Sequence, residues 1–516
     1  MPRRLLVRPV ALCLTVAAVS FIFMGFSEGE GKVSLLPGGL ADSSAQTRAP
    51  APTPGFENPD QELSPAALKD DFELLRFALE DAHAGLYRYV PKADMDQQFD
   101  ALEKRLSRPL RISQFYAEVL KLAAAIRDGH TRVQAPSSLT AWLRQKPIRP
   151  PIAIHFEGDR VRVLKDVSGR EPSAVGSEVV AVNGRPIGEV VSALLRYLPG
   201  DGYSDGRRSN LEYPDVFGGL FALEYGETEK YVFHVRSADG KERDLEVAGL
   251  PVEELEKRMG PLRPRPSGPL LSLGFEGDVA VLTVRSFGPR TLSSSGLSYP
   301  DFLTQAFQTL LEKKTESLII DVRNNGGGND EYGQMLYAHL APAPFHYYDR
   351  LQMNKEKSEF LRRTNDPDTG GSLTPPRLDE KGRWVRTDHP NLGLKQPREP
   401  VFAGRVFILE NGRSFSATGE FMTAVYANKR AVFIGEESGA GITGNTSGIM
   451  IGVKLTNSGI TVSVPMVGYY MAGDHGPHPE RGILPDHEVI PTVEDVLAGR
   501  DPVLEIALKL ARHPGQ

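Results

Sequence analysis

Two stretches of the chain share one pattern, in which a continuous apolar run ends in a tight turn and a helix-like segment follows. The first combines an apolar run over residues 317–322, a glycine turn over 326–328 and a helical pattern over 332–339. The second combines an apolar run over 406–409 with a helical pattern over 417–428. Continuous apolar strands are typical of parallel sheets that are buried on both faces. The sequence therefore predicts a mainly parallel α/β core in which both turns open at the carboxyl ends of the strands.

Ser416 stands immediately before the second predicted helix. The first N–H groups of a helix have no intrahelical partners and carry the positive end of the helix dipole, so an oxyanion formed beside Ser416 would be stabilised. An ordinary serine N-cap is the alternative interpretation, because many helices begin this way. Ser414 is a second candidate hydroxyl, but it lies farther from the helix start. This window alone leaves both interpretations of Ser416 open.

The glycine turn at Gly326, Gly327 and Gly328 allows positive φ angles and close backbone approach, so its N–H groups could form an anion-binding concavity. The spacing is not that of a dinucleotide-binding GxGxxG motif, and the Lys and Ser/Thr of a phosphate-binding loop are missing. A simple turn is the alternative. The sequence thus argues against nucleotide phosphates as the ligand of this turn.

Length and charge limit the class of protein. The chain has 516 residues, enough for roughly three domains at about 150 residues each. Hydrophobic residues make up 40% and charged residues 24%, which is typical of a folded globular body. The 60 Lys and Arg stand against 66 Asp and Glu, for a net charge of -6, and no long basic stripe is present. We therefore expect no nucleic acid partner.

The N-terminus has the pattern of an export signal. Arg3, Arg4 and Arg8 precede an uncharged apolar run over residues 9–26, which predicts a signal peptide or a membrane anchor over 1–27 and an extracytoplasmic location for the rest. The only cysteine, Cys13, lies in this run, which excludes a disulfide framework and a cysteine nucleophile from the remainder of the chain.

The remaining sequence divides into four predicted segments. Residues 28–62 are rich in Gly, Pro, Ser and Ala and predict a flexible linker. Residues 63–140 predict helices, the first capped by Ser64 and the last ending at Gly129. Residues 141–260 predict a β-rich module with hairpins near Gly158 and Gly240; the strand and turn over 176–187 resemble those of PDZ domains, which bind peptide C-termini. Residues 261–516 predict the α/β catalytic domain. A β unit without a peptide ligand is the alternative for the PDZ-like module.

Six short segments, in this order, resemble the tail-specific, or C-terminal processing, family of serine peptidases. They lie at residues 128–131, 321–328, 411–421, 434–437, 455–459 and 480–486. The resemblance extends over most of the chain from Leu63 onward. It implies an α/β catalytic core related to the ClpP/crotonase fold, preceded by a helical segment and a PDZ-like β-rich module. It also implies a peptide or protein substrate, and we expect no metal and no cofactor.

The family divides by the group that activates its serine. One branch uses a lysine, but Gly441 stands at the corresponding position of this chain. The other branch resembles the tricorn core peptidase and uses an upstream histidine with a glutamate near the C-terminus, which correspond here to His130 and Glu480. Histidine suits the role because it is neutral near pH 7 and can return a proton to a leaving amine. The tricorn type also has a serine before its histidine, where this chain has Gly129.

The resemblance therefore implies an endopeptidase with Ser416 as nucleophile, His130 as general base and Glu480 as orienting acid, and an oxyanion hole formed by the backbone N–H groups of Gly327 and Ala417. Other acids remain open in place of Glu480, namely Asp128, Glu436 and Asp474. The missing serine leaves the link from Glu480 to His130 open as well: direct, through water, or through Thr131. Glu420, near the start of the second predicted helix, is expected to be structural.

Two other classes of function remain. His475, His478 and Glu480 are clustered and could ligate zinc, although two prolines make this a rigid loop rather than a helical motif. A non-catalytic ligand- or peptide-binding protein on the same fold is the second alternative, because a fold does not fix a function. The polar segment over residues 346–396 lies between two core elements, as insertions that cover a site often do. The oligomeric state is left open.

Overall fold

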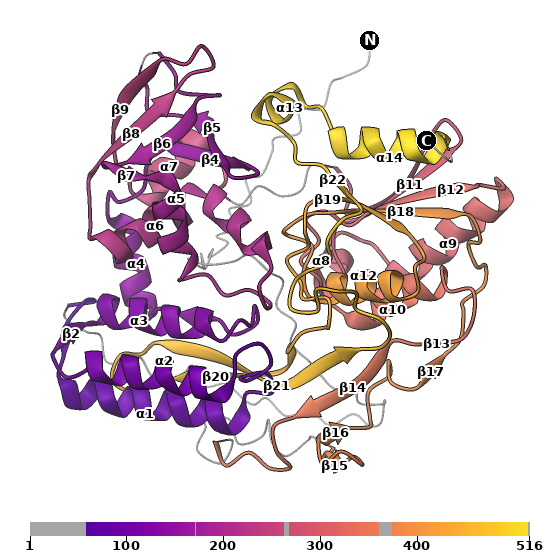
Figure 1. Cartoon of the computed structure of the whole chain (residues 1–516), viewed down its shortest axis with the longest axis horizontal. Coiled ribbons are helices and arrows are strands. Elements are labelled where there is room, and N and C mark those ends of the chain that lie inside the picture. Colours follow the sequence, from indigo (N-terminus) through magenta and orange to yellow (C-terminus); the bar gives the residue numbers. More distant parts are fainter. Residues whose placement is uncertain (1–57, 171, 263–267, 361–373, 514–516) are drawn as a thin grey trace, which may run out of the picture.

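The computed structural model describes residues 58–170, 172–262, 268–360 and 374–513. The predicted signal peptide or anchor and residues 28–57 of the predicted linker lie outside this range. Figure 1 shows three regions: N-terminal helices, a β-rich module beside them, and an α/β core that contains the C-terminal half of the chain.

The N-terminal helices begin where the sequence predicts. The Ser64 hydroxyl accepts a hydrogen bond from the Ala67 N–H, and Pro65 is the first helical residue of α1, because proline fixes a helical φ where no N–H is needed. The elements of this region are β1 (Glu62–Leu63), α1 (Pro65–Ala82), α2 (Lys92–Arg105), β2 (Leu110–Arg111), α3 (Ile112–Ala125), β3 (Val133–Gln134) and α4 (Ser137–Gln145).

The end of α3 differs from the prediction that placed it at Gly129. The helix ends at Ala125, and the left-handed residue that follows is Arg127, with φ 64°. Glycine is needed at position 129 for another reason: a Cβ there would lie 2.6 Å from the Phe415 ring. The short loop after α3 therefore packs closely against the α/β core.

The β-rich module contains one antiparallel sheet in the order β4-β5-β6-β8-β9, with β7 paired to β6. Both predicted hairpins are present, one at Gly158 between β4 and β5 and one at Gly240 between β8 and β9. The elements are β4 (Ile152–Glu157), β5 (Arg160–Asp166), β6 (Glu178–Val182), β7 (Arg185–Pro186), α5 (Ile187–Leu195), η1 (Asp205–Glu212), α6 (Pro214–Tyr225), β8 (Lys230–Arg236), β9 (Glu242–Ala248) and α7 (Val252–Met259).

The core is a sheet in the order β10-β11-β12-β18-β19-β22, in which every pair except β10 with β11 is parallel. The strands are β10 (Leu271–Glu276), β11 (Val279–Val284), β12 (Ser317–Asp321), β18 (Arg405–Glu410), β19 (Val432–Gly435) and β22 (His487–Glu488), and the helices are α8 (Pro289–Ser294), α9 (Tyr299–Glu312), α10 (Asp330–Ala338), α12 (Ala417–Ala427), α13 (Val493–Ala498) and α14 (Pro502–Arg512).

Helices cover both faces of this sheet (Figure 1). Ile319 and its neighbours on one face pack against Ala507 and the rest of α14. Leu318 and Ile320 belong to the opposite face, which shares a hydrophobic cluster with residues of α9, α10 and α12. Because successive side chains of a strand point to opposite faces, a strand between two helical layers must be apolar throughout. This explains the continuous apolar run of β12.

The two predicted turns lie side by side. Strands β12 and β18 pair in parallel, with Asp321 beside Leu409. Their carboxyl ends therefore meet at one edge of the sheet, as the sequence predicts. The glycine turn follows β12 there, and the turn that leads to Ser416 follows β18.

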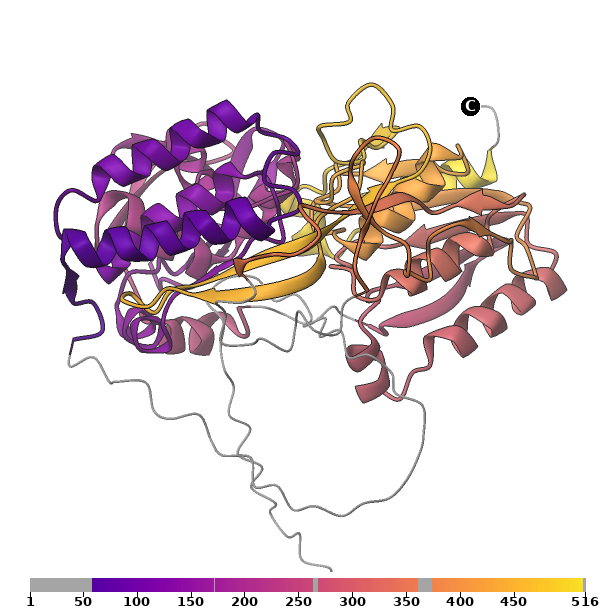
Figure 2. The same ribbon diagram turned by 90° about the horizontal axis from the view of Figure 1, so that it is seen from below.

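A further sheet connects the core with the N-terminal helices. Its order is β15-β16-β14-β21-β20, and β3 pairs with β21. The long β20–β21 hairpin reaches from the core to α1, as Figures 1 and 2 show. The polar insertion noted in the sequence supplies three strands of this sheet, which are β14 (Tyr348–Met353), β15 (Arg377–Leu378) and β16 (Trp384–Arg386), while the hairpin itself is β20 (Gly448–Lys454) and β21 (Thr461–Met471). Two further short strands near the insertion, β13 (Phe345–His346) and β17 (Leu394–Lys395), pair with each other in a separate sheet.

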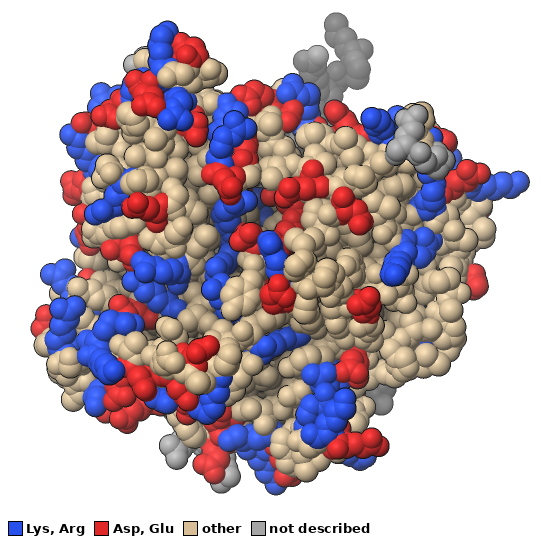
Figure 3. Space-filling view, viewed as in Figure 1, with Lys and Arg blue, Asp and Glu red and all other residues tan. Residues whose placement is uncertain are grey.

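The surface is mixed in charge. Figure 3 shows Lys and Arg interspersed with Asp and Glu over the face in view. No helix among the described residues is both long and apolar enough to cross a membrane.

Substitution of two adjacent glycines of α6 would test how this helix packs on the segment before β4. A Cβ on Gly218 would lie 2.6 Å from the Ile148 carbonyl oxygen and 2.7 Å from the Arg149 Cα, whereas one on Gly219 meets nothing within 4 Å. We expect Gly218→Ala to lower the free energy of unfolding by about 1–3 kcal/mol. Gly219→Ala, the matched control, should raise it by roughly 0.5–1 kcal/mol because alanine favours a helix. Denaturant unfolding measures both, and equal effects would contradict this packing.

Candidate active site

Ser416 occupies a strained turn at the start of α12. Its φ and ψ are 57° and -129°, and its side chain makes no capping hydrogen bond. A non-glycine residue in such a conformation costs about 1–3 kcal/mol and persists only where the surrounding structure enforces it. The Ser416 hydroxyl therefore does not act as an N-cap of α12, which was the alternative interpretation of this residue.

His130 is the group that the Ser416 hydroxyl meets. Its Nε2 lies 3.1 Å from the Ser416 Oγ, although the two residues are 286 positions apart. The imidazole stacks on the Phe415 ring, with 4.8 Å between ring centroids and 25° between ring planes. The residue next to the serine thus helps to hold the histidine in place.

Burial sets the charge of this histidine. His130 is 6% exposed, and desolvation lowers its pKa to about 4, with a nearby Arg132 adding to the effect and Asp128 opposing it. The imidazole is therefore neutral near pH 7. A neutral imidazole can accept the proton of the serine hydroxyl.

Asp128 is an acid that the structure brings to His130. Its Oδ1 accepts a hydrogen bond from the His130 backbone N–H at 2.8 Å and lies 4.0 Å from the His130 Nδ1. That Nδ1 is buried and makes no hydrogen bond within the described residues. An imidazolium formed at His130 would therefore find its nearest charge partner in Asp128.

Hydrogen bonds keep Asp128 ionised. Burial alone would raise the pKa of this carboxyl, but hydrogen bonds and charge interactions with His83 and His130, with a hydrogen bond from Thr446, lower it well below its usual value. The His83 Nε2 lies 3.0 Å from Asp128 Oδ2. The Thr131 hydroxyl, one of the links considered toward Glu480, instead lies 2.7 Å from His83 Nε2.

Asp201 is a second acid at this place, and no sequence pattern pointed to it. It comes from the β-rich module and is 2% exposed. Its Oδ1 accepts from the Gly129 N–H at 2.8 Å, and its Oδ2 accepts from the Gly441 N–H at 3.3 Å. Burial, and then the charge of Asp128, raise the pKa of Asp201 to about 7.

Glu480 is not brought to His130. Its carboxylate is 46% exposed and lies 3.6 Å from the His478 Nδ1, while its backbone carbonyl accepts a hydrogen bond from the Tyr203 N–H at 2.8 Å. Of the two other acids considered, Asp474 accepts from the Gly476 N–H, and Glu436 lies near Glu212. Asp128, rather than Glu480, is therefore the acid that lies beside His130.

The two predicted oxyanion donors, the N–H groups of Gly327 and Ala417, lie together beside Ser416, but they differ in their hydrogen bonds. A Cβ on Gly327 would lie 2.8 Å from the Ser416 Cβ and 2.9 Å from the Ala417 nitrogen, so only glycine fits. The Gly327 N–H donates to the Asn325 Oδ1 at 3.0 Å. Within the described part of the chain, the Ala417 N–H donates no hydrogen bond. The Ala417 N–H is thus the donor that is ready for a developing negative charge.

Ser414 and Glu420 have structural contacts. The Ser414 hydroxyl donates to the Val322 carbonyl at 3.0 Å and so ties the turn after β18 to the turn after β12. The Glu420 carboxylate accepts hydrogen bonds from Tyr348 and Asn445, each at 2.7 Å. Both side chains are buried, as expected for groups that hold the site rather than react in it.

The position of Gly441 leaves no room for a lysine. A Cβ there would lie 2.5 Å from the Tyr89 hydroxyl and 3.2 Å from the Asp201 Cβ. The structure thus gives a steric reason, beyond the residue type, why this position holds no lysine base.

One group of His and Asp side chains among the described residues brings three ligand atoms close together. The His475, His478 and Glu480 set does not bring three ligand atoms together, whereas Asp128, His130 and Asp201 have theirs within 4.8 Å of one another. Tetrahedral zinc at bonds of about 2.1 Å needs ligand atoms about 3.4 Å apart, and the Asp128 Oδ1 lies 4.0 Å from the His130 Nδ1. The oxygens of both acids also accept protein N–H groups. This arrangement suits a hydrogen-bond network better than a metal.

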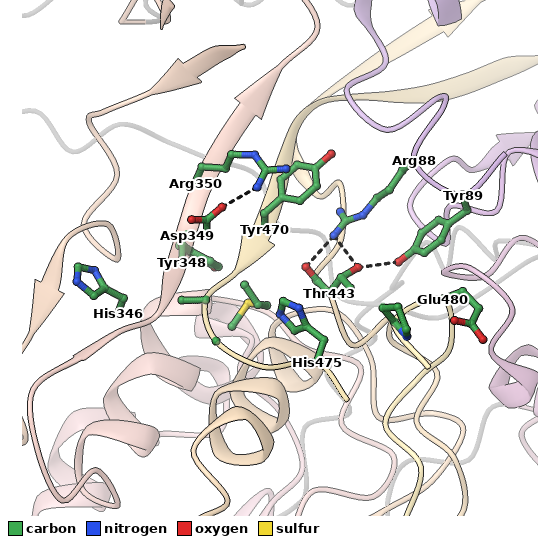
Figure 4. A pocket seen from close by; sticks show the side chains of 14 residues that line it. Arg88, Tyr89, His346, Tyr348, Asp349, Arg350, Thr443, Tyr470, His475 and Glu480 are labelled. Atoms are coloured by element: carbon green, nitrogen blue, oxygen red, sulfur yellow. Dashed lines mark hydrogen bonds and ion pairs between the residues drawn. The ribbon is translucent and has the colours of Figure 1, made fainter. Parts of the chain in front are cut away.

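A pocket of about 860 Å³ adjoins this network (Figure 4). Arg88 and Arg350 both line this pocket, and their guanidinium groups lie 4.3 and 3.6 Å from the centroid of the Tyr470 ring. The Tyr89 hydroxyl lies 3.3 Å from the Thr443 Oγ1, two residues from Gly441. Glu480 lines the pocket, whereas Ser416 and His130 do not.

The chain is similar to known proteins in part of its sequence and in its fold. Residues 278–489 match the model of Peptidase family S41. No curated protein sequence matches the chain. The structure is similar to the crystal structure of mature CPAF, with a TM-score of 0.59, 16% identity, and coverage of 87% of this chain and 99% of that chain.

Two further solved structures are similar. Mature CPAF complexed with lactacystin has a TM-score of 0.58, 16% identity and coverage of 86% of this chain and 98% of that chain. The photosystem II D1 C-terminal processing protease has a TM-score of 0.40, 17% identity and coverage of 87% and 98%. The CPAF likeness and the family match confirm the predicted fold class, an α/β peptidase core with a helical segment and a β-rich module before it. The family match also supports a serine-type peptidase function.

Substitutions of Asp128 and Glu480 are expected to have different effects. If Asp128 orients His130, we expect Asp128→Asn to slow the reaction of Ser416 with a fluorophosphonate by about 100-fold or more, because the imidazolium loses its charge partner. Glu480→Gln should stay within about twofold, since an exposed ion pair contributes little. The second-order labelling rate constant measures both. The reverse order of effects would restore Glu480 as the orienting acid.

Proposed function

We propose that this chain is a serine peptidase that cleaves peptide bonds through an acyl-enzyme on Ser416, with His130 as general base. The proposal rests on one observation above the others, the 3.1 Å contact between the Ser416 Oγ and the His130 Nε2. A serine hydroxyl is a weak nucleophile, and a neutral histidine within hydrogen-bonding distance is the usual means of activating it. The match to Peptidase family S41 supports the same chemistry.

The steps follow from the positions of these groups. The Ser416 Oγ attacks the carbonyl carbon of the scissile bond while its proton passes to the His130 Nε2. The carbonyl π electrons move to its oxygen, and the Ala417 N–H stabilises the charge; the Gly327 N–H, shared with Asn325, is the second donor. Each such donor contributes roughly 3–4 kcal/mol to the transition state.

The second half of the reaction reverses the proton transfer. The C–N bond breaks, and the His130 imidazolium returns its proton to the leaving amine. A water molecule then attacks the acyl carbon while His130 accepts its proton. The bond from the acyl carbon to the Ser416 Oγ breaks, His130 returns the proton to that oxygen, and the carboxyl product leaves. In the charged state of His130 the Nδ1–H turns toward Asp128, whose 4.0 Å separation must shorten. Catalytic hydrogen bonds are often long in free enzymes and tighten when substrate binds.

An extracytoplasmic location belongs to the same proposal. Its support is the sequence pattern of Arg3, Arg4 and Arg8 before an apolar run. The substrate is a peptide or protein, as for the homologues of the family. Peptide binding by the PDZ-like module is compatible with cleavage as an endopeptidase.

A fluorophosphonate probe tests the nucleophile and the base directly. We expect the purified full-length protein to be labelled on Ser416, no labelling in Ser416→Ala, and a rate at least about 100-fold lower in His130→Ala, because proton transfer is lost. Ser294→Ala and His234→Ala, which change an exposed residue of α8 and a partly exposed residue of β8, should label like the wild type. Intact-mass spectrometry gives the extent of labelling over time.

Two results would contradict the proposal. Equal labelling of the wild type and Ser416→Ala would show a different nucleophile. Absent labelling in the wild type, with all variants folded by circular dichroism, would favour a ligand- or peptide-binding protein on this fold.

A further inference from the structure

One segment of the β-rich module enters the candidate active site. Residues 199–212, here called the insert, connect α5 with α6 and include η1. The insert meets three loops that surround the Ser416–His130 pair: the loop before His130, the turn before Ser416 and the loop over residues 436–441. It therefore joins elements that lie far apart in the sequence.

The contacts of the insert are specific and buried. The Gly202 N–H donates to the Arg127 carbonyl at 2.9 Å, and the Ser204 hydroxyl donates to the Ser438 carbonyl at 2.6 Å. A Cβ on Gly206 would lie 2.7 Å from the Gly439 Cα and 2.9 Å from the Gly412 Cα, so three backbones meet without side chains. Such close packing holds the insert at a fixed distance from the nucleophile turn.

An ion pair anchors the far end of the insert to the same turn. Glu212 accepts a hydrogen bond from Arg413 at 2.7 Å and another from His155 at 2.8 Å. Arg413 lies three residues before Ser416, and His155 is on β4 of the module. The module is thereby connected to the nucleophile turn by charge as well as by packing.

Asp201 is the residue through which the insert reaches the base. Its carboxylate bonds the Gly129 N–H, directly before His130, and the Gly441 N–H on the opposite loop. A carboxylate oxygen of Asp201, a carboxylate oxygen of Asp128 and a ring nitrogen of His130 all lie within 4.8 Å of one another. Two buried carboxylates at this distance repel each other strongly, because the surroundings have a low dielectric. The ionisation of one carboxyl therefore affects the ionisation of the other and of the imidazole.

We propose that Asp201 is a positioning residue of the peptidase, supplied by the β-rich module, which fixes the turn that carries His130 and whose ionisation increases the basicity of His130. The inference rests on the proposed function, since it concerns the same base. It assigns the β-rich module a part in completing the active site. This part is separate from any peptide that the module binds.

The direction of the pH effect follows from the charges. The pKa of Asp201 is raised to about 7 by burial and by Asp128, so near pH 6 Asp201 is neutral beside an ionised Asp128. Above pH 7 Asp201 is ionised as well, so that two negative charges, those of Asp128 and Asp201, lie near His130. An added negative charge stabilises the imidazolium and so raises the basicity of the imidazole. We therefore expect the reaction at Ser416 to accelerate as pH rises through about 7.

Other titratable groups face Asp201 and must be distinguished from it. Arg88 and Tyr89 lie in the loop after α1, Asp128 precedes His130, and Glu420 lies on α12. The pKa of Glu420 is raised to about 8 by burial and by Asp330. Glu420 is therefore the group whose titration most needs a control.

The test is the pH dependence of fluorophosphonate labelling between pH 5.5 and 8.5. For the full-length wild type we expect a rise of up to about tenfold between pH 6 and pH 8, as a group of pKa near 7 ionises. Asp201→Asn keeps an acceptor for the Gly129 N–H but cannot ionise, so its profile should be flat through pH 7. Asp205→Asn, on an exposed part of the same insert, and Glu420→Gln should keep the rise.

Each outcome decides the inference. A rise near pH 7 in Asp201→Asn equal to that of the wild type, or a fall in wild-type rate above pH 7, would overturn it. If Asp201→Asn does not fold, the wild-type profile with the Glu420→Gln control still gives the sign. Labelling of wild type but not of Ser416→Ala, with an unchanged Asp201→Asn profile, would leave the proposed function standing and remove only the role of Asp201.

Discussion

The parallel pairing of β12 with β18 determines where the reactive groups of this protein lie. Because the two strands run in the same direction with Asp321 beside Leu409, the turns that follow them emerge together at one edge of the sheet. Ser414 then bonds the Val322 carbonyl across the two turns, and Gly327 packs against Ser416 at a distance that excludes any side chain. The strained backbone of Ser416 is maintained by these contacts, since a strained residue needs surroundings that enforce it.

Electrostatics complete what the sheet begins. His130 is buried against Phe415 and has a low pKa, which keeps it neutral, but the proposed catalytic role of His130 requires a charged intermediate. A buried imidazolium is costly unless a negative group stands near it. Asp128, kept ionised by His83 and Thr446, is that group. Asp201 beside it has its pKa displaced in the opposite direction. Two acids in one environment are thus driven to different charge states, as is common at sites of proton transfer.

The sequence predicted more of the fold than of the polar network. Apolar runs, the Ser64 cap and the hairpins at Gly158 and Gly240 are local patterns, and the structure confirms them. The predicted end of α3 at Gly129 was wrong. Glycine is needed at position 129 because Phe415, which is far away in the sequence, packs against it. Asp201 had no local signal at all, since an aspartate in an irregular loop resembles any solvated acid. Glu480 had a motif to support it, yet its carboxylate is exposed and paired with His478.

The sequence by itself determined the α/β core, the helix that follows Ser416 and the absence of a lysine at position 441, because each depends on residue type and short spacing. It also gave His130 as a candidate through a resemblance of motifs. Only the tertiary structure decided which groups meet. Three segments of the chain, one from the N-terminal region, one from the β-rich module and one from the core, converge on the Ser416–His130 pair. Which carboxylate reaches a buried imidazole depends on backbone packing between distant loops, and such packing leaves no periodic or local pattern in the sequence.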